Sequence, residues 1–503
     1  MDRLNSAYGQ LAATFAQLGH LDAARSTLFW DGRTKMPPGG AASRGKVMAT
    51  LTSVVAEKLA DPALAALLDR AEDEEAPQHG DWEAANLREM RRRWRHETAI
   101  PPAMAAELAE RVSLSQKAWE QARRDSDFAA FAEPLRAVLS LQLEVARTKG
   151  DALGMAPYDA MMDAHEPGLT TAFVDALFAD LGSFLPPLLA RIMERQAAEP
   201  PPIPLPGPFP EAAQFALSEK LAAMIGYDFE HGRIDLTAHP FAAGVPGDVR
   251  ITTRFLDDDP IGGVMATMHE TGHAMYEAGL PHEWAFQPAG LARGMGLHES
   301  QSLLMEMQAG RSRAFLPVLA RLMRDTFGGE GDAWSDDNIR RIYRRVRPSH
   351  IRVDADEVTY PLHVILRYRI ERALTDGALE IEGIPEAWNA LSRELLGITP
   401  PSDALGCLQD IHWAMGAFGY FPSYTYGAVA AAQLFAAATR QDPEIVPALR
   451  RGEFAPLLGW TRDHVHTRAS LPPTSEAILR AATGNPLTSA AFKTHLTARY
   501  LVE

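Results

Sequence analysis

The chain has 503 residues, of which 46% are hydrophobic, 8% aromatic and 23% charged, a balance typical of a folded globular protein rather than a disordered one. Its formal net charge of -16 argues against a nucleic-acid partner, because binding to phosphates depends on clustered Lys and Arg. The sequence has no basic-then-apolar start, no run of about 18 apolar residues and one cysteine, Cys407, which together predict a cytoplasmic protein without a membrane partner.

Apolar residues spaced three and four positions apart predict helices through most of the first 200 residues. The basic run between Arg88 and Arg95 lies on one of them among Glu83, Glu89 and Glu97, which predicts ion pairs on a solvated face. The Pro-rich segment 199–210 predicts an extended surface crossing within one domain, with a linker as the alternative. The predicted helices of this part are 4–28, 42–60, 82–99, 103–124, 127–150 and 171–198.

One region, 229–255, has the pattern of β-structure. Within it, 232–237 and 248–255 predict short strands joined by a turn at 244–247. The second strand could pair with an extended substrate backbone, as edge strands do, or belong to a plain structural hairpin. Helical patterns then return and predict helices over 261–278, 296–325, 336–347, 357–376, 386–396, 408–417, 428–439 and 474–483.

The strongest chemical signal is the sequence His-Glu-Thr-Gly-His at 269–273, which has the form H-E-x-x-H. One helical turn separates His269 from His273, so both imidazoles leave the same face and can share one metal ion. Glu270 would project beside that ion, where it can take a proton from a water molecule on the metal. Two histidines satisfied within a helical core are the alternative interpretation. The apolar pattern around the motif and the stop at Gly279 fit a buried helix that carries a zinc site.

A catalytic zinc needs a third protein ligand and an open fourth position. The metzincin pattern would require glycine and histidine where this chain has Tyr276 and Gly279, so that class is excluded. The best candidate is Glu299, which opens the next strong helical pattern after a gap that suits a turn and a return. The less favoured candidates are Glu277, His282 and Glu283.

An enzyme that removes C-terminal residues would also need a fixed cation for the terminal carboxylate of its substrate. Arginine suits that task, because its planar guanidinium pairs with a carboxylate through two hydrogen bonds. The spacing does not choose among the candidates, which are Arg250, Arg254, Arg293 and Arg352.

Six blocks of sequence resemble the carboxypeptidase Taq family of zinc metallocarboxypeptidases, the thermostable carboxypeptidase type. They are His-Pro-Phe at 239–241, Asp-Val-Arg-Ile-Thr at 248–252, the motif at 269–273, His-Glu-Ser-Gln at 298–301, Ile-Arg-Val-Asp-Ala-Asp at 351–356 and Gly-Cys-Leu-Gln-Asp-Ile-His-Trp at 406–413. The resemblance implies a mainly α-helical, saddle-shaped single domain with a deep central groove and a small β-sheet next to the zinc-binding helix. It also implies a homodimer and supports Glu299 as the third ligand.

The resemblance further assigns substrate contacts. Arg250 and Arg352 would meet the carboxyl end of the substrate and limit the groove, and the alternative is structural ion pairing with Asp248, Asp354 or Asp356. His412, Tyr420 and Tyr424 would form a wall of the groove, where a histidine or tyrosine could stabilise an oxyanion.

The predicted function is therefore a zinc-dependent carboxypeptidase of broad specificity that releases single residues from peptides with a free C-terminus. It would hold one Zn²⁺ per chain, which Co²⁺ could replace. Residues 1–503 would form one catalytic domain, with a helical part at 1–228, the strands and zinc site at 229–310 and a helical groove wall at 311–503. The alternatives are a zinc-dependent oligoendopeptidase and a metal-stabilised peptide-binding protein without catalysis.

Overall fold

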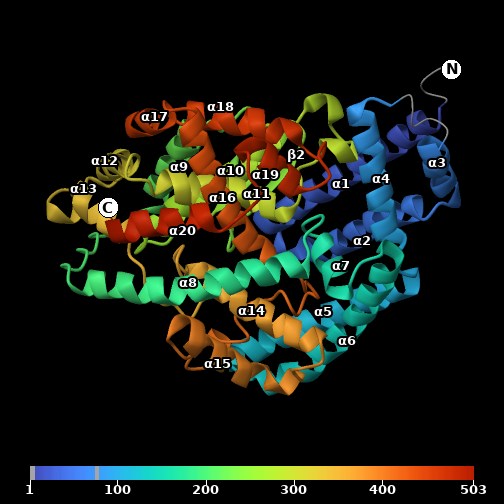
Figure 1. Ribbon diagram of the computed structural model, residues 1–503, viewed down its shortest axis with the longest axis horizontal. Coiled ribbons are helices and arrows are strands. Elements are labelled where there is room, and N and C mark those ends of the chain that lie inside the picture. The colour runs from blue at the N-terminus through green and yellow to red at the C-terminus, as the bar shows by residue number, and fades with distance from the viewer. Residues whose placement is uncertain (1–5, 74–78, 503) are drawn as a thin grey trace. The chain divides into compact units, whose positions relative to one another are not determined.

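The computed structural model describes residues 6–73 and 79–502 and contains two compact units. The first unit consists of Met1–Glu97, Pro202–Arg344 and Ala430–Leu487, and the second of Thr98–Pro201, Arg345–Val429 and Thr488–Glu503. The described residues form twenty α-helices and one three-stranded sheet, which confirms the prediction of a mainly helical fold with a small sheet (Figure 1). The prediction of a single catalytic domain stays a prediction.

Most of the helices belong to the first unit. They are α1 (Ala7–Thr34), α2 (Ala41–Leu59), α3 (Pro62–Asp73), α4 (Asp81–Thr98), α9 (Glu211–Ile225), α10 (Pro260–Ala278), α11 (Met295–Leu303), α12 (Leu316–Phe327), α13 (Asp336–Tyr343), α17 (Ile445–Arg451), α18 (Ala455–His464), α19 (Ser475–Thr483) and the greater part of α16 (Pro422–Gln441). The predicted helix 296–325 is interrupted, because a π-helical segment, η6 (Leu304–Gly310), and a turn separate α11 from α12. Apolar residues keep their helical spacing across this interruption, so the sequence pattern does not reveal it.

The first four helices pack around a shared apolar core, and Figure 1 draws them in blue. Ser6 caps α1 by accepting a hydrogen bond from the backbone N–H of Gly9, which satisfies a donor that the first turn would leave unpaired. The core contains fully buried residues from each of the four helices, including Leu11, Leu59, Leu68 and Met90. Burial of these side chains is what fixes the helices to one another.

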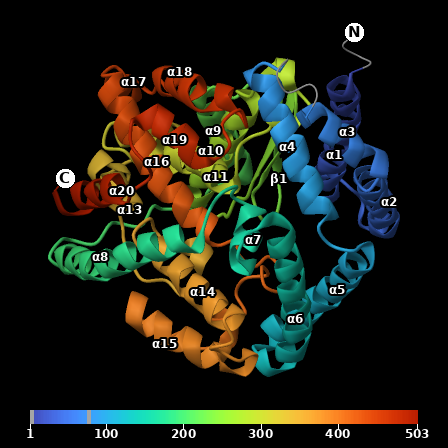
Figure 2. The ribbon, with the colours of Figure 1, turned by 45° about the vertical axis from the view of Figure 1, so that its right-hand side comes forward.

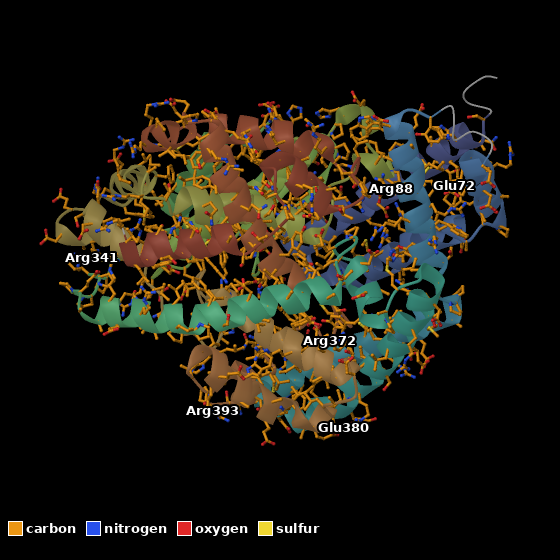
Figure 3. The ribbon with its side chains drawn as sticks, viewed as in Figure 1. Glu72, Arg88, Arg341, Arg372, Glu380 and Arg393 are labelled. Carbon is orange, nitrogen blue, oxygen red and sulfur yellow. The ribbon has the colours of Figure 1, made fainter. Side chains whose placement is uncertain are left out.

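The basic run on α4 is paired, as predicted, although its partners come mainly from other helices. Arg91 binds Glu72 on α3 through Nε and Nη2 at 2.9 and 2.7 Å, and Arg93 binds Asp22 on α1 at 2.7 Å. Figure 3 labels Arg88 on α4 and Glu72 on the neighbouring α3. The run therefore serves helix packing rather than a basic binding surface.

The sheet contains β1 (Ile234–Leu236), β2 (Ala242–Val245) and β3 (Asp248–Thr253) in the order β1-β3-β2. β3 pairs in parallel with β1 and in antiparallel with β2, so Ile251 lies opposite both Ile234 and Ala242. The prediction of strands at both ends of this region is confirmed, but β2 was missed because its sequence, Ala-Ala-Gly-Val, has no alternation. The turn at 246–247 therefore joins β2 to β3 rather than the two predicted strands. The suggestion that the 248–255 strand pairs with substrate is wrong, since β1 and β2 occupy both sides of β3.

The second unit is helical in all its described elements. It contains α5 (Pro102–Asp125), α6 (Phe128–Leu153), α7 (Pro157–Asp163), α8 (Thr171–Ala197), α14 (Tyr360–Thr375), α15 (Ile384–Leu396), α20 (Ala490–Thr497) and the first turns of α16. Figure 2 shows α5 and α6 side by side. The segment 200–210 has no regular structure, as predicted, and the boundary between the units falls inside it at Pro201.

Among the described helices, α8 alone has the length and apolar composition of a membrane span. Its apolar side is buried, and Leu181 and Leu185 are fully inaccessible. The helix packs against α14 and α15, and its Asp175 accepts a hydrogen bond of 2.6 Å from Tyr368 on α14. One side of α8 is therefore packed within the second unit.

The predicted helix 408–417 is wrong, because this segment is a series of turns. The Gln409 side chain donates to the backbone carbonyl oxygens of His350 and Gly406 at 2.9 and 3.1 Å and accepts from the backbone N–H of Arg352 at 2.8 Å. A side chain that bonds the backbone of other segments holds the chain in an irregular path.

Candidate active site

Helix α10 carries both histidines of the motif and is fixed at its start by capping. Asp259 accepts hydrogen bonds from the backbone N–H groups of Ile261 and Gly262, and Pro260 occupies the first helical position, where no N–H is needed. The predicted stop is also confirmed, since Gly279 is the C-terminal cap. The two caps therefore fix where α10 begins and ends, and His269 and His273 lie between them.

The backbones of α10 and α11 approach closely at Gly272, inside the motif. A Cβ atom at this position would lie 2.5 Å from the carbonyl oxygen of Gln301 and 2.6 Å from Cα of Ser302. Only glycine allows this approach, because atoms of the neighbouring backbone cannot move aside as the end of a flexible side chain can. The approach brings Glu299 on α11 to the histidine face of α10.

Replacing Gly272 by Ala should therefore destabilise the protein by about 1–3 kcal/mol and weaken metal binding, because α11 must shift away from α10. Urea unfolding and metal titration of the variant check this. Gly459→Ala on α18 is the matched control, since a Cβ there meets nothing within 4 Å and should leave stability equal or slightly higher. Equal stability and metal affinity of Gly272→Ala and its parent would contradict the role of this contact.

His269, His273 and Glu299 converge on one point. Oε2 of Glu299 lies 3.7 Å from Nε2 of His269 and 3.4 Å from Nε2 of His273. The three donor atoms lie within 4.8 Å of one another, so a single ion could contact all of them. Two imidazole nitrogens and one carboxylate oxygen are a common donor set of catalytic zinc sites.

The other candidate ligands lie elsewhere. Glu277 accepts a hydrogen bond from Nε2 of His298 at 2.8 Å, and His282 and Glu283 are exposed in the short helix η4 (His282–Trp284). Within the described part of the chain, the three converging residues are the one cluster with metal-binding geometry.

Glu270 is buried beside this cluster, with 6% of its surface exposed. Its Oε2 atom has no hydrogen-bond partner among the described residues. Burial raises the pKa of Glu270 to about 7. A buried carboxylate with an unused oxygen and a pKa near neutrality has the properties of a general base.

The charges of the cluster are strongly coupled. Burial opposes a charge on His269, but the carboxylates of Glu299, Glu306 and Glu270 raise its pKa to about 10. Burial lowers the pKa of His273 to about 4. Burial also opposes a charge on Glu299, yet the two histidines lower its pKa to about 2. The site therefore has a carboxylate ready to neutralise a cation.

Arg250, a predicted substrate residue, lies on β3 in the same unit. Its Nε and Nη2 atoms donate to the two carboxylate oxygens of Asp248 at 2.8 and 2.5 Å, and its guanidinium lies 4.2 Å from the ring centre of Trp30. The structural ion pair with Asp248, which the sequence left open as an alternative, is thus present.

The remaining predicted substrate residues lie in the second unit, where Arg352 is the centre of a buried cluster. Nε and Nη2 of Arg352 donate to Oδ1 of Asp410 at 3.1 and 2.9 Å, and Nη1 donates to the hydroxyl of Tyr360 at 2.5 Å. The predicted alternative partners, Asp354 and Asp356, are not the ion-pair partners of Arg352.

His412, Tyr420 and Tyr424 gather around this cluster. The His412 and Tyr424 side chains approach to 3.4 Å between Nε2 and the hydroxyl, and the ring of Tyr420 lies 5.5 Å from that of His412. The guanidinium of Arg352 lies 5.0 Å from the centre of the Tyr424 ring. The structure therefore places the four residues in one group within the second unit.

Sequence reasoning missed two charged residues of this group. Arg367 on α14 is fully buried and binds Oδ2 of Asp410 through Nε at 2.7 Å. Glu371, one turn later, accepts hydrogen bonds from Tyr158, Trp413 and the backbone N–H of Gly419 at 2.6, 2.8 and 2.9 Å. Arg367 and Glu371 are four positions apart, which places both on one face of the predicted helix, and this spacing is the signal that could have found them.

Comparisons with known proteins identify the family of the chain. The family model of carboxypeptidase Taq (M32) metallopeptidases matches residues 10–500. Thermostable carboxypeptidase 1 of Thermus thermophilus is 39% identical over 475 residues, which cover 92% of each chain. Carboxypeptidase 1 of Bacillus subtilis is 33% identical over 488 residues, which cover 97% of this chain and 95% of that one.

Solved structures show the same similarity in three dimensions. Trypanosoma cruzi metallocarboxypeptidase 1 matches with a TM-score of 0.96 at 37% identity, covering 98% of this chain and 99% of that chain. The M32 carboxypeptidase from Deinococcus radiodurans R1 matches with a TM-score of 0.93 at 33% identity, covering 98% of each chain. The similarity extends over nearly the whole length of both proteins.

Proposed function

Because the chain belongs to the carboxypeptidase Taq (M32) family and is a metallocarboxypeptidase, we propose that it holds one Zn²⁺ on His269, His273 and Glu299. The observation that carries this assignment is the convergence of three donor atoms within 4.8 Å of one another. The donor set fits zinc, which binds imidazole nitrogen and carboxylate oxygen and keeps a position open in catalytic sites. Co²⁺ suits similar ligands and should replace it.

A divalent ion bound there supplies Lewis-acid polarisation of the scissile carbonyl and lowers the pKa of a water molecule. We assign the proton transfers to Glu270. Its buried carboxylate takes the proton of the attacking water and then gives it to the leaving amine, which departs as a neutral amino group. Its Oε2 atom, which has no hydrogen-bond partner in the described part of the chain, and its raised pKa of about 7 support this role.

For substrate binding we propose Arg250 and Arg352, which would pair with the terminal carboxylate of a peptide. Each guanidinium is oriented by one aspartate, and that pairing uses two of its five N–H donors. His412, Tyr420 and Tyr424 are proposed as further substrate contacts. Their grouping around Arg352 supports this assignment.

The proposed location and assembly are supported by the sequence and by the resemblance to the family. We propose a cytoplasmic homodimer that acts on peptides with a free C-terminus and broad specificity. The single, buried cysteine fits a reducing compartment.

Mass spectrometry of a short peptide after incubation with the metal-loaded protein tests this function. The peptide with a free C-terminus should lose single residues step by step from that end, and a chelator should stop the loss. The same peptide with a C-terminal amide should stay intact, because it offers no carboxylate to the arginines. Equal internal cleavage of both peptides would instead identify an oligoendopeptidase and would contradict the roles of Arg250 and Arg352.

A further inference from the structure

The two histidines of the site have different partners on the ring nitrogen that faces away from Glu299. Nδ1 of His269 lies 2.9 Å from Oε2 of Glu306, whose other oxygen accepts a hydrogen bond from Arg311 at 3.1 Å. Nδ1 of His273 lies 2.6 Å from Nδ1 of a third histidine, His298. One ring is therefore held by a carboxylate and the other by an imidazole.

The contact between two ring nitrogens restricts where the protons can be. A neutral imidazole has one N–H donor and one acceptor nitrogen, so one of the two Nδ1 atoms must carry the hydrogen and the other must lack it. Nε2 of His298 lies 2.8 Å from Oε1 of Glu277, a carboxylate that accepts hydrogen bonds. His298 therefore carries its proton on Nε2 and accepts at Nδ1 from the N–H of His273.

This arrangement of protons determines whether Nε2 of His273 can bind a metal ion. With its proton on Nδ1, the ring has a lone pair on Nε2, the atom that lies 3.4 Å from Glu299. The opposite arrangement, with His298 donating from Nδ1, would place the proton of His273 on Nε2 and remove the lone pair that a metal requires. Glu277 on His298 thus selects the form of His273 that binds metal.

We infer that Glu277 and His298 are a positioning pair that holds His273 in its metal-binding tautomer and orientation. The inference rests on the proposed metal site and deepens it. It also explains the location of Glu277, which follows His273 by one helical turn on α10 and contacts His298 rather than a metal ion. His298 directly precedes Glu299 on α11, so one helical segment supplies both a ligand and the partner of another ligand.

Metal competition with a chromogenic chelator tests the pair on the full-length protein loaded with Zn²⁺. His298→Leu removes the acceptor and should weaken zinc affinity about 10- to 100-fold, the usual effect of losing such a partner. His298→Asn places an amide oxygen near the position of Nδ1 and should recover most of the affinity. Glu283→Gln, an exposed change between α10 and α11, is the control and should equal the parent.

The Co²⁺-substituted protein gives a second readout that does not depend on activity. The visible absorption of cobalt should shift in His298→Leu and return toward the parent spectrum in His298→Asn, because it reports the geometry of the ligands. Parent-like zinc affinity and cobalt spectrum in His298→Leu would overturn the inference, as would equal losses in both variants. If the parent itself bound no zinc, the proposed metal site would fail, and that result is distinguishable because it does not depend on His298.

Discussion

Replacing Glu270 by Gln should lower kcat for peptide hydrolysis by about 100- to 10,000-fold, the range expected for loss of a general base. The amide has nearly the same shape as the carboxylate but cannot take a proton. Glu270 is buried beside the three converging donors and is not one of them, so zinc content should remain at one ion per chain. Single-turnover kinetics together with metal analysis of the purified variant measure both quantities.

The control for this change is Glu283→Gln, which introduces the same substitution at an exposed position and should keep full activity. A Glu270→Gln variant with near-normal turnover would remove Glu270 from the proton transfers. Loss of zinc together with activity would instead assign Glu270 a part in holding the metal.

Replacing Asp410 by Asn should lower the free energy of unfolding by about 3–5 kcal/mol, the cost of leaving a buried charge without its partner. Asp410 is the carboxylate that binds both Arg352 and Arg367, whose side chains are 6% and 0% exposed. Asparagine fills the same space but leaves both guanidinium groups without a counter-charge. Urea unfolding at neutral pH measures the difference from the parent.

The pH dependence of this difference has a definite sign. Burial alone would raise the pKa of Asp410, but the guanidinium groups of Arg367 and Arg352 hold it below its ordinary value. The folded protein therefore binds the proton less readily than the unfolded chain does, and the stabilisation is complete above the unfolded pKa of about 4. The difference between parent and variant should be constant from pH 5 to 8 and shrink as the pH falls below about 4.

Asp354→Asn is the matched control, because Asp354 is exposed in the segment that contains Arg352. It should change the free energy of unfolding by no more than about 0.5 kcal/mol. An Asp410→Asn variant as stable as this control would show that the buried cluster does not need its negative charge.

The helices of the fold were largely predictable, because their signals are local. The predicted helix 171–198 corresponds to α8 at Thr171–Ala197, and 261–278 corresponds to α10 at Pro260–Ala278. Stops such as Gly279 act within one turn of the helix and can be read directly. The short helices α3, α7, α17, α18 and α20 were missed, although α13 and α19, which have similar lengths, were predicted.

The pairing partners of the sheet and of the charged residues were less predictable, because they depend on contacts between distant segments. β3 is the central strand because β2 pairs with its second side, and the sequence of β2 has no strand pattern from which this could be predicted. The pairing of Arg352 with Asp410 joins residues 58 positions apart, whereas the alternatives considered from the sequence were near neighbours.

The partners of the Nδ1 atoms of His269 and His273 were also unpredictable, because they too come from a different segment of the chain. Spacing within H-E-x-x-H brings His269 and His273 to one face, and a second helix was expected to supply Glu299. Nothing in that spacing indicates which atoms meet the far side of each imidazole. Those partners, Glu306 and His298, follow from the path of the chain after α10.

The most direct test of the metal site is anomalous diffraction at the zinc absorption edge from crystals of the zinc-loaded protein. We expect one anomalous peak per chain, about 2.0–2.2 Å from Nε2 of His269, Nε2 of His273 and a carboxylate oxygen of Glu299. A peak on other residues, or binding through Nδ1 of either histidine, would contradict both the ligand set and the proton arrangement inferred for His273.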